Sequence, residues 1–134
     1  MRKRLIPAAL SLVSLAVCLT SCGRRQEVPG TERLTAPAKQ FVELLANDNF
    51  TTAFGKLNDT MKQAMPPQQL EGAWRALITQ AGQFKRQIGV RTTKEQGFDC
   101  VYVTCEFEKK TMDVKVVFDR AQRIGGLWFV PSQL

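Results

Sequence analysis

The spacing of apolar residues changes once along this chain, at Gly82, and this change constrains the fold more than any other feature. Before Gly82, apolar residues recur every three or four positions, as on one face of a helix. After Gly82 they alternate with polar residues, as on a half-buried strand. Helices followed by strands with one apolar face predict an α+β fold, with N-terminal helices packed on a four-stranded antiparallel curved sheet.

Three helices are expected before Gly82. The first covers about residues 36–46. The second follows Asn49, whose side chain can cap it, and is expected to end at residues 58–59. The third begins at Pro67, because proline is tolerated in the first turn of a helix, and ends at Gly82. Its apolar stripe consists of Leu70, Ala73, Trp74, Leu77, Ile78 and Ala81.

Four strands are expected after Gly82, over residues 84–95, 99–107, 112–118 and 124–130. The first is the weakest pattern, with Ile88, Val90 and Thr92 on one face. In the last strand, either Trp128 or the pair Leu127 and Phe129 faces the helices, because Gly125 and Gly126 could carry a bulge.

Alternation also predicts how the second and third strands pair. Turning the chain across residues 108–111 places every apolar side chain of both strands on one face, as a fixed register requires. The expected pairs are Phe107 with Met112, Cys105 with Val114, Val103 with Val116, Val101 with Phe118 and, on the other face, Glu106 with Asp113.

The first 22 residues predict where the protein is located. Basic residues 2–4 precede an apolar run over residues 5–19, which is typical of a secretory signal. About 15 apolar residues are too few for a membrane-spanning helix, which needs roughly 20. The tetrapeptide Leu-Thr-Ser-Cys over residues 19–22 resembles the lipobox of bacterial lipoproteins, which implies that Cys22 is acylated and becomes the mature N-terminus.

The chain therefore divides into three expected regions. Residues 1–21 are a lipoprotein signal peptide, residues 22–34 a lipid anchor and flexible tether, and residues 35–134 a folded domain. The expected location is the bacterial cell membrane, with the domain lipid-anchored on the extracytoplasmic side. A plain secretory signal that is cut nearby is the alternative.

Composition excludes several classes of function. The chain has no histidine, and the only serine beyond position 21 is Ser132, so a Ser-His-Asp triad, a Cys-His pair and a histidine-ligated zinc site are excluded. No catalytic residue, metal site or cofactor is predicted. The formal net charge is +7, but three of the basic residues belong to the predicted signal, and an extracytoplasmic protein rarely meets nucleic acid. No nucleic-acid partner is expected.

A pocket between the two layers is one candidate binding site. Trp74 lies in the middle of the third helix and should face Val103, Val116 and Phe84. A space left between these side chains would take a small apolar ligand. The alternative is that these residues form a solidly packed core.

The outer face of the sheet is the other candidate. By alternation Cys100, Tyr102 and Val117 point away from the helices, and such a modestly apolar surface suits a protein partner or a homodimer. Cys105 should be buried and Cys100 half-exposed. The two cysteines should lie roughly 16 Å apart on opposite faces of one strand, too far for a disulfide.

Several short segments form a recognisable series: Phe41-Val42-Glu43-Leu44-Leu45, Asp48-Asn49-Phe50, Leu57-Asn58-Asp59-Thr60-Met61-Lys62, Leu70 to Trp74, Val101-Tyr102-Val103 and Gly126-Leu127-Trp128-Phe129-Val130-Pro131. Together they resemble the domain of unknown function 3887 family (DUF3887), over about residues 37–131. The expected architecture is similar to cystatin-like and nuclear-transport-factor-2-like (NTF2-like) cones. The resemblance also implies that some family members carry this domain ahead of a secreted α/β-hydrolase domain.

These observations predict a membrane-anchored lipoprotein whose small domain is a non-catalytic ligand-binding or interaction module. Two alternatives stay open. The domain could be an accessory to a separately encoded α/β-hydrolase or transporter, or it could be a small enzyme that uses carboxylates.

Overall fold

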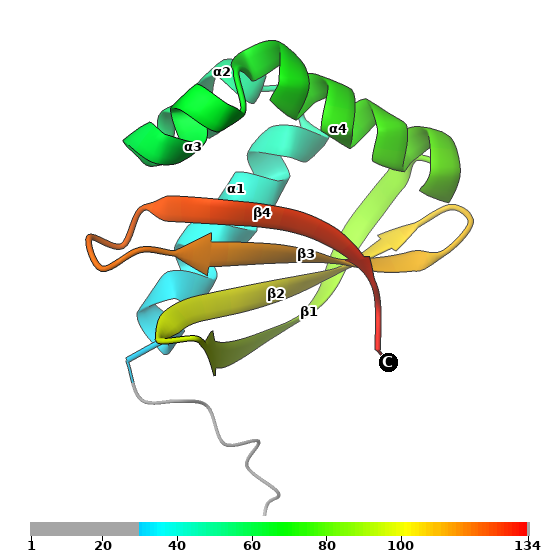
Figure 1. Cartoon of the computed structure of the whole chain (residues 1–134). Helices are drawn as coiled ribbons and strands as arrows, with labels where there is room; N and C mark the ends of the chain where they lie inside the picture. Colours follow the sequence, from blue (N-terminus) through cyan, green and yellow to red (C-terminus); the bar gives the residue numbers. More distant parts are fainter. Residues whose placement is uncertain (1–29, 134) are drawn as a thin grey trace, which may run out of the picture.

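The computed structural model describes residues 30–133, in which helices and a sheet form two layers (Figure 1). In chain order the elements are η1 Glu32–Leu34, α1 Thr35–Ala46, α2 Phe50–Gly55, α3 Asp59–Ala64, α4 Pro67–Ala81, β1 Phe84–Glu95, β2 Phe98–Phe107, β3 Thr111–Phe118 and β4 Ile124–Pro131. The α+β fold predicted from the change of spacing at Gly82 is confirmed. The predicted signal peptide of residues 1–21, and Cys22 after it, lie outside the described residues.

Helix α4 begins and ends where the sequence predicts. Pro67 is its first residue, and Gly82 follows its last with φ +85°, a conformation that favours glycine. The Gly82 N–H donates a hydrogen bond of 2.8 Å to the carbonyl of Ile78. A Cβ at Gly82 would lie 2.7 Å from the Cβ of Glu108, so a side chain there would also push away the turn between β2 and β3.

Helix α3 was not predicted, because Asn58 begins a helix instead of ending one. The Asn58 side-chain oxygen accepts a hydrogen bond of 2.8 Å from the N–H of Met61 and so caps α3. The same side chain donates to the Asp119 carboxylate at 3.0 Å, which ties α3 to the loop between β3 and β4. The cap predicted for Asn49 is confirmed, since its side chain accepts from the N–H of Thr52.

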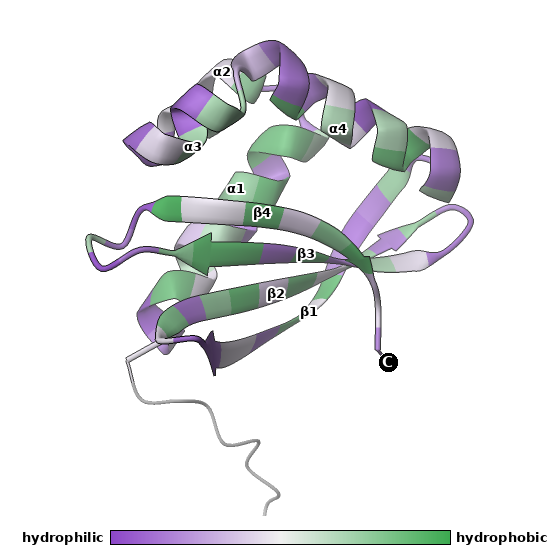
Figure 2. Ribbon diagram, viewed as in Figure 1, coloured by the Kyte–Doolittle hydropathy of each residue, from purple (hydrophilic) through white to green (hydrophobic). Residues whose placement is uncertain are grey.

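The four strands form one antiparallel sheet in the order β1-β2-β3-β4. Helix α1 packs on β1 and β2, and α3 lies beside β4. Figure 1 shows α1 behind the sheet, and within residues 30–133 no helix covers the face toward the viewer, which we call the outer face. Figure 2 shows hydrophobic and hydrophilic residues alternating along β2 and β3. Because successive side chains of a strand point to opposite faces, this alternation gives the sheet one apolar face and one more polar face.

The predicted register of β2 and β3 is wrong by two residues. Val103 pairs with Val114 and not with Val116, and Thr104 takes the place predicted for Glu106 opposite Asp113. A slip of two residues leaves every side chain on its predicted face, because the period of a strand is two. Hydrophobic alternation alone could therefore not distinguish the two registers.

The structure settles which side of β4 faces the helices. Leu127 is buried and Phe129 packs against the core, whereas Trp128 is 52% exposed. In β1, a bulge between Gln87 and Gly89 turns Ile88 outward, so the expectation that Ile88 shares a face with Val90 is wrong.

The folded part begins before residue 35. Glu32–Leu34 form the 3-10 turn η1, and both Thr31 and Leu34 are buried. The last residues of the expected tether over residues 22–34 thus belong to the domain, because Leu34 contributes to its apolar core.

Candidate functional site

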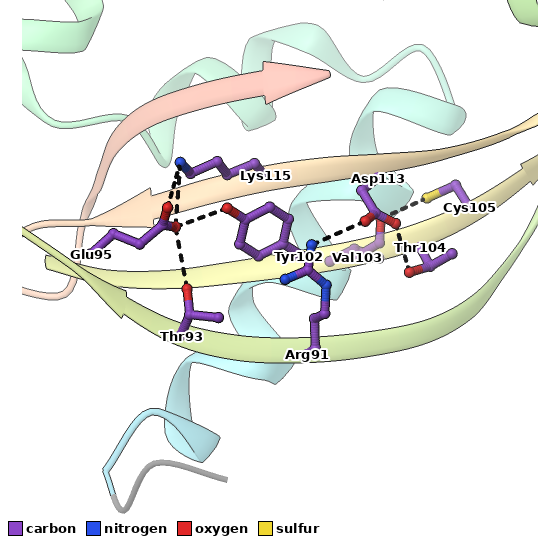
Figure 3. A network of polar contacts seen from close by, with 9 residues as sticks. All are labelled: Arg91, Thr93, Glu95, Tyr102, Val103, Thr104, Cys105, Asp113 and Lys115. Atoms are coloured by element: carbon purple, nitrogen blue, oxygen red, sulfur yellow. Dashed lines mark hydrogen bonds and ion pairs between the residues drawn. The ribbon is translucent and has the colours of Figure 1, made fainter. Parts of the chain in front are cut away.

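A network of polar side chains lies on the outer face, centred on Tyr102 (Figure 3). Strands β1, β2 and β3 place Arg91, Tyr102 and Lys115 side by side, because these three residues are neighbours in the sheet register. The Arg91 guanidinium carbon lies 3.7 Å from the centre of the Tyr102 ring, and the Lys115 ammonium lies 5.6 Å from it. Two cations thus flank one aromatic ring.

Glu95 receives most of the hydrogen bonds in this network. The Tyr102 hydroxyl donates to the Glu95 carboxylate at 2.8 Å, and the Thr93 hydroxyl donates at 3.2 Å. The Lys115 ammonium forms an ion pair with the same carboxylate at 3.3 Å. Tyr102 therefore has a fixed ring orientation, and its proton already has an acceptor.

Asp113 is the most deeply buried carboxylate of the outer face, with 1% of its side chain exposed. It accepts a hydrogen bond of 2.7 Å from the Thr104 hydroxyl and pairs with Arg91 at 3.4 Å. The predicted juxtaposition of Glu106 and Asp113 is wrong, because Glu106 instead pairs with Arg86 at 2.9 Å. Both carboxylates thus have a cationic partner.

The network shifts the pKa values of its acidic groups further from neutral pH. Hydrogen bonding from Tyr102 lowers the pKa of Glu95 to about 2. Burial, together with the nearby Glu95 carboxylate, raises the pKa of Cys100 to about 11 and also raises the pKa of Tyr102. Although burial acts to lower the pKa of Lys115, its contacts with Tyr102 and Glu95 raise it. At neutral pH Glu95 is therefore a weak base, and Cys100 and Tyr102 hold their protons.

A hollow of about 600 Å³ opens beside this network. It lies between the outer face and the residues around the start of α3. Two exposed aromatic side chains line it, Phe98 at 47% and Trp128 at 52% exposure. The polar side chains in its lining include Asn58, Thr60, Glu95, Lys115 and Asp119.

The four residues predicted to line a pocket between the layers do not form one together. Val103 and Val116 are fully buried. The Trp74 ring lies 6.1 Å from the Phe84 ring, 5.9 Å from Phe107 and 6.0 Å from Phe129, which fills the space around it. Trp74 and Phe84 do line a separate hollow of about 320 Å³ at the end of α4.

The predicted interaction face is present but partly covered. Cys100, Tyr102 and Val117 all point away from the helices, as alternation predicts. Cys100 is only 1% exposed and not half-exposed. Tyr102 is 9% exposed, because Arg91 of β1 and Lys115 of β3 lie over its ring. Cys100 and Cys105 are both free thiols, and Cys105 is buried in the core as predicted.

Sequence reasoning missed the residues that build the network, namely Arg91, Glu95, Lys115 and the exposed Trp128. Alternation within each strand places Arg91, Glu95 and Lys115 opposite the core face, so a strand-by-strand census of charged residues could have found these three. Trp128 could not be assigned in this way, because Gly125 and Gly126 left the face of the last strand open. The contribution of Asn58 to the hollow could not have been found in this way, because it lies in the α2–α3 segment. Within residues 30–133 no group of three or more His, Cys, Asp or Glu side chains is placed to hold a metal ion.

Comparison with known proteins identifies the family. Residues 38–127 match the model of a family described as "Protein of unknown function (DUF3887)". The chain belongs to the DUF3887 family. The match runs from α1 into β4 and confirms the resemblance expected from the sequence motifs. The more specific likeness to cystatin-like and NTF2-like cones stays a prediction.

A curated protein also matches part of the chain. The chain is 25% identical over 89 residues to Esterase EstD of Thermotoga maritima. The aligned residues make up 66% of this chain but 22% of the esterase, so this chain spans about a fifth of that relative's length. No solved structure matches the chain. Among the helices of residues 30–133, none has the length and apolar character needed to cross a membrane.

Proposed function

We propose that this protein is a bacterial lipoprotein, anchored through Cys22 on the extracytoplasmic side of the cell membrane, whose DUF3887 domain is a non-catalytic binding or interaction module. The anchor rests on the basic residues 2–4, the apolar run and the Leu-Thr-Ser-Cys tetrapeptide that precede the domain.

The binding role rests on one observation, the internal pairing of the outer-face network. Each group that could act as an acid, base or nucleophile there already has a partner. Glu95 has three hydrogen-bond donors, Tyr102 donates to Glu95, and Asp113 has Thr104 and Arg91. A general acid or base works best with a pKa near the operating pH. The pKa of Glu95 is lowered, and the pKa values of Cys100 and Tyr102 are raised, so all three lie further from neutral pH. This supports a rigid recognition surface over an active site.

An ester-hydrolysis assay tests the non-catalytic role, because the curated relative is an esterase. We expect the full chain to hydrolyse short-chain p-nitrophenyl esters no faster than buffer does. The variants Tyr102→Phe and Cys100→Ser should give the same background rate. Hydrolysis by the full chain that either substitution abolishes would contradict a non-catalytic module and would place the chemistry on the outer face.

A second candidate function is favoured by the partial match to the esterase. Since the chain corresponds to about a fifth of that protein, it could act as an accessory module for a separate hydrolase. The test is co-elution of this chain with EstD from which the 89 aligned residues have been deleted. Co-elution that is lost on competition with the isolated 89-residue EstD segment would support this role, and separate elution would exclude it for that hydrolase.

A further inference from the structure

Trp128 is a large exposed side chain that is held in a defined place. It lies in β4 with 52% of its surface exposed. Its indole lies over Gly126, where an added Cβ would clash with the indole Cζ3 and would come within 2.7 Å of Cη2. The Lys115 ammonium lies 5.3 Å from the indole centre. Because Gly126 has no side chain, the indole can pack directly against the backbone there.

The groups around Trp128 can bond to uncharged polar atoms of either kind. Glu95 offers carboxylate oxygens as acceptors, and Lys115 offers an ammonium donor. Asn58 and Asp119 line the same hollow and are hydrogen-bonded to each other at 3.0 Å. The hollow measures about 600 Å³, within the usual size range of small-ligand sites.

The charges in the hollow decide which class of ligand it suits. A cation placed on Trp128 would meet the Lys115 ammonium, and an anion would meet the carboxylates of Glu95 and Asp119. A wholly apolar ligand would displace the water that solvates the exposed parts of these polar groups and would offer no hydrogen bonds in return, which is costly. A neutral ligand with one flat apolar face and several hydroxyl groups avoids each of these penalties.

We propose that the hollow binds a neutral saccharide, with one sugar ring stacked on Trp128 and its hydroxyl groups bonded to Glu95 and Lys115. The C–H face of a pyranose ring is flat and apolar, as the exposed indole is. Sugar hydroxyls both donate and accept, which matches a carboxylate and an ammonium that already lie 3.3 Å apart. This assignment rests on the proposed function, whose binding partner it names.

Titration of the indole N–H signals tests the site directly. The chain has two tryptophans, so the full chain, labelled with ¹⁵N, gives two indole signals, which Trp128→Phe assigns. The protein is kept in a zwitterionic detergent without a sugar headgroup. The probes are cellohexaose, chitohexaose and maltohexaose, each up to about 10 mM, which is roughly ten times a Kd of 1 mM. We expect at least one hexasaccharide to shift the Trp128 signal while the buried Trp74 signal stays in place.

Three variants, whose saccharide binding is measured by calorimetry, show whether the exposed Trp128 indole is responsible for the binding. Trp128→Ala should weaken binding about tenfold or more, since a buried tryptophan contact commonly dominates an interface. Gly126→Ala keeps the indole, but the added Cβ would displace the indole atoms Cζ3 and Cη2 from their position over residue 126. This variant should therefore also weaken binding. Ile88→Ala is the control, because Ile88 is an exposed apolar residue that lines another hollow, and it should bind normally.

The outcomes separate this inference from the proposed function. No Trp128 shift with any of the three hexasaccharides, or equal binding by Trp128→Ala, would overturn the saccharide site and leave the lipoprotein module standing. Shortening of a bound hexasaccharide during incubation would support the site but contradict a non-catalytic role. Co-sedimentation with insoluble cellulose or chitin, compared with the soluble hexasaccharides, distinguishes a polymer ligand from a free oligosaccharide.

Discussion

Glu95 is the residue on which the outer-face network depends. Its carboxylate holds the Tyr102 hydroxyl, the Thr93 hydroxyl and the Lys115 ammonium together. Each donor stabilises the ionised form, and Tyr102 contributes most to the low pKa. The same arrangement keeps Lys115 beside Trp128, so Glu95 positions one side of the hollow.

The low pKa of Glu95 predicts how stability depends on pH. A carboxylate with a folded pKa of about 2 and an ordinary value of 4.5 stabilises the fold fully above pH 4.5 and loses that contribution as pH falls towards 2. Because 42% of the side chain is exposed, the gain should stay below about 1 kcal/mol. Thermal melts of wild type and Glu95→Gln should therefore differ at pH 7, and the difference should shrink as the pH falls from 4.5 towards 2. The exposed-helix variant Glu71→Gln is the control, and a constant difference for Glu95→Gln across this range would contradict the prediction.

The outer face also shows what alternation can and cannot predict about single residues. It places Cys100, Tyr102 and Val117 on the correct side of the sheet. It does not predict that Arg91 and Lys115 fold back over Tyr102, because the rotamers of long side chains depend on their partners across the strands. The sequence therefore predicts where the site lies, but not which of its side chains are covered by their neighbours.

The contribution of the Asn58 cap to the stability of α3 can be measured by substitution. Asn58→Ala removes the acceptor for the Met61 N–H and the donor to Asp119, and should lower the free energy of unfolding by about 1–2 kcal/mol in a urea titration. Asn49→Ala is the matched comparison and should cost less, because its bond to the Thr52 N–H is longer, at 3.3 Å, and exposed. Equal losses for the two variants would mean that the bond to Asp119 contributes nothing.

The long helices and the strands could be predicted from the sequence, whereas α3 and the register between β2 and β3 could not. Helices α1 and α4 carry apolar stripes, but α3 has no buried residue and thus no stripe to detect. The register between β2 and β3 depends on contacts made by their turn. The Glu108 N–H donates to the Gln83 carbonyl at 3.0 Å and the Lys109 N–H donates to the Ala81 carbonyl at 2.8 Å, so the end of α4 fixes the turn. Such long-range hydrogen bonds leave no periodic signal in the sequence.

At the level of the whole domain, Trp74 joins the two layers. It is 2% exposed and packs against rings from β1, β2 and β4. Trp74→Ala should therefore cost about 3–5 kcal/mol in denaturant unfolding, through lost packing and the cavity left behind. Trp128→Ala removes the same side chain from an exposed position and should cost less than about 1 kcal/mol. Similar losses at both positions would contradict the assignment of Trp74 to the core and Trp128 to the surface.

In the proposed arrangement, residues that precede the domain hold it at a membrane. We propose acyl chains at Cys22 as the anchor, because two or more such chains hold a protein stably on a bilayer. Partition of the protein, expressed in a bacterium from its full gene, between detergent and aqueous phases tests this most directly. The wild type should enter the detergent phase, and Cys22→Ser should move to the aqueous phase, with Cys18→Ser as the matched control that behaves like wild type. A wild type that stays in the aqueous phase, or a Cys22→Ser variant that partitions unchanged, would contradict the account.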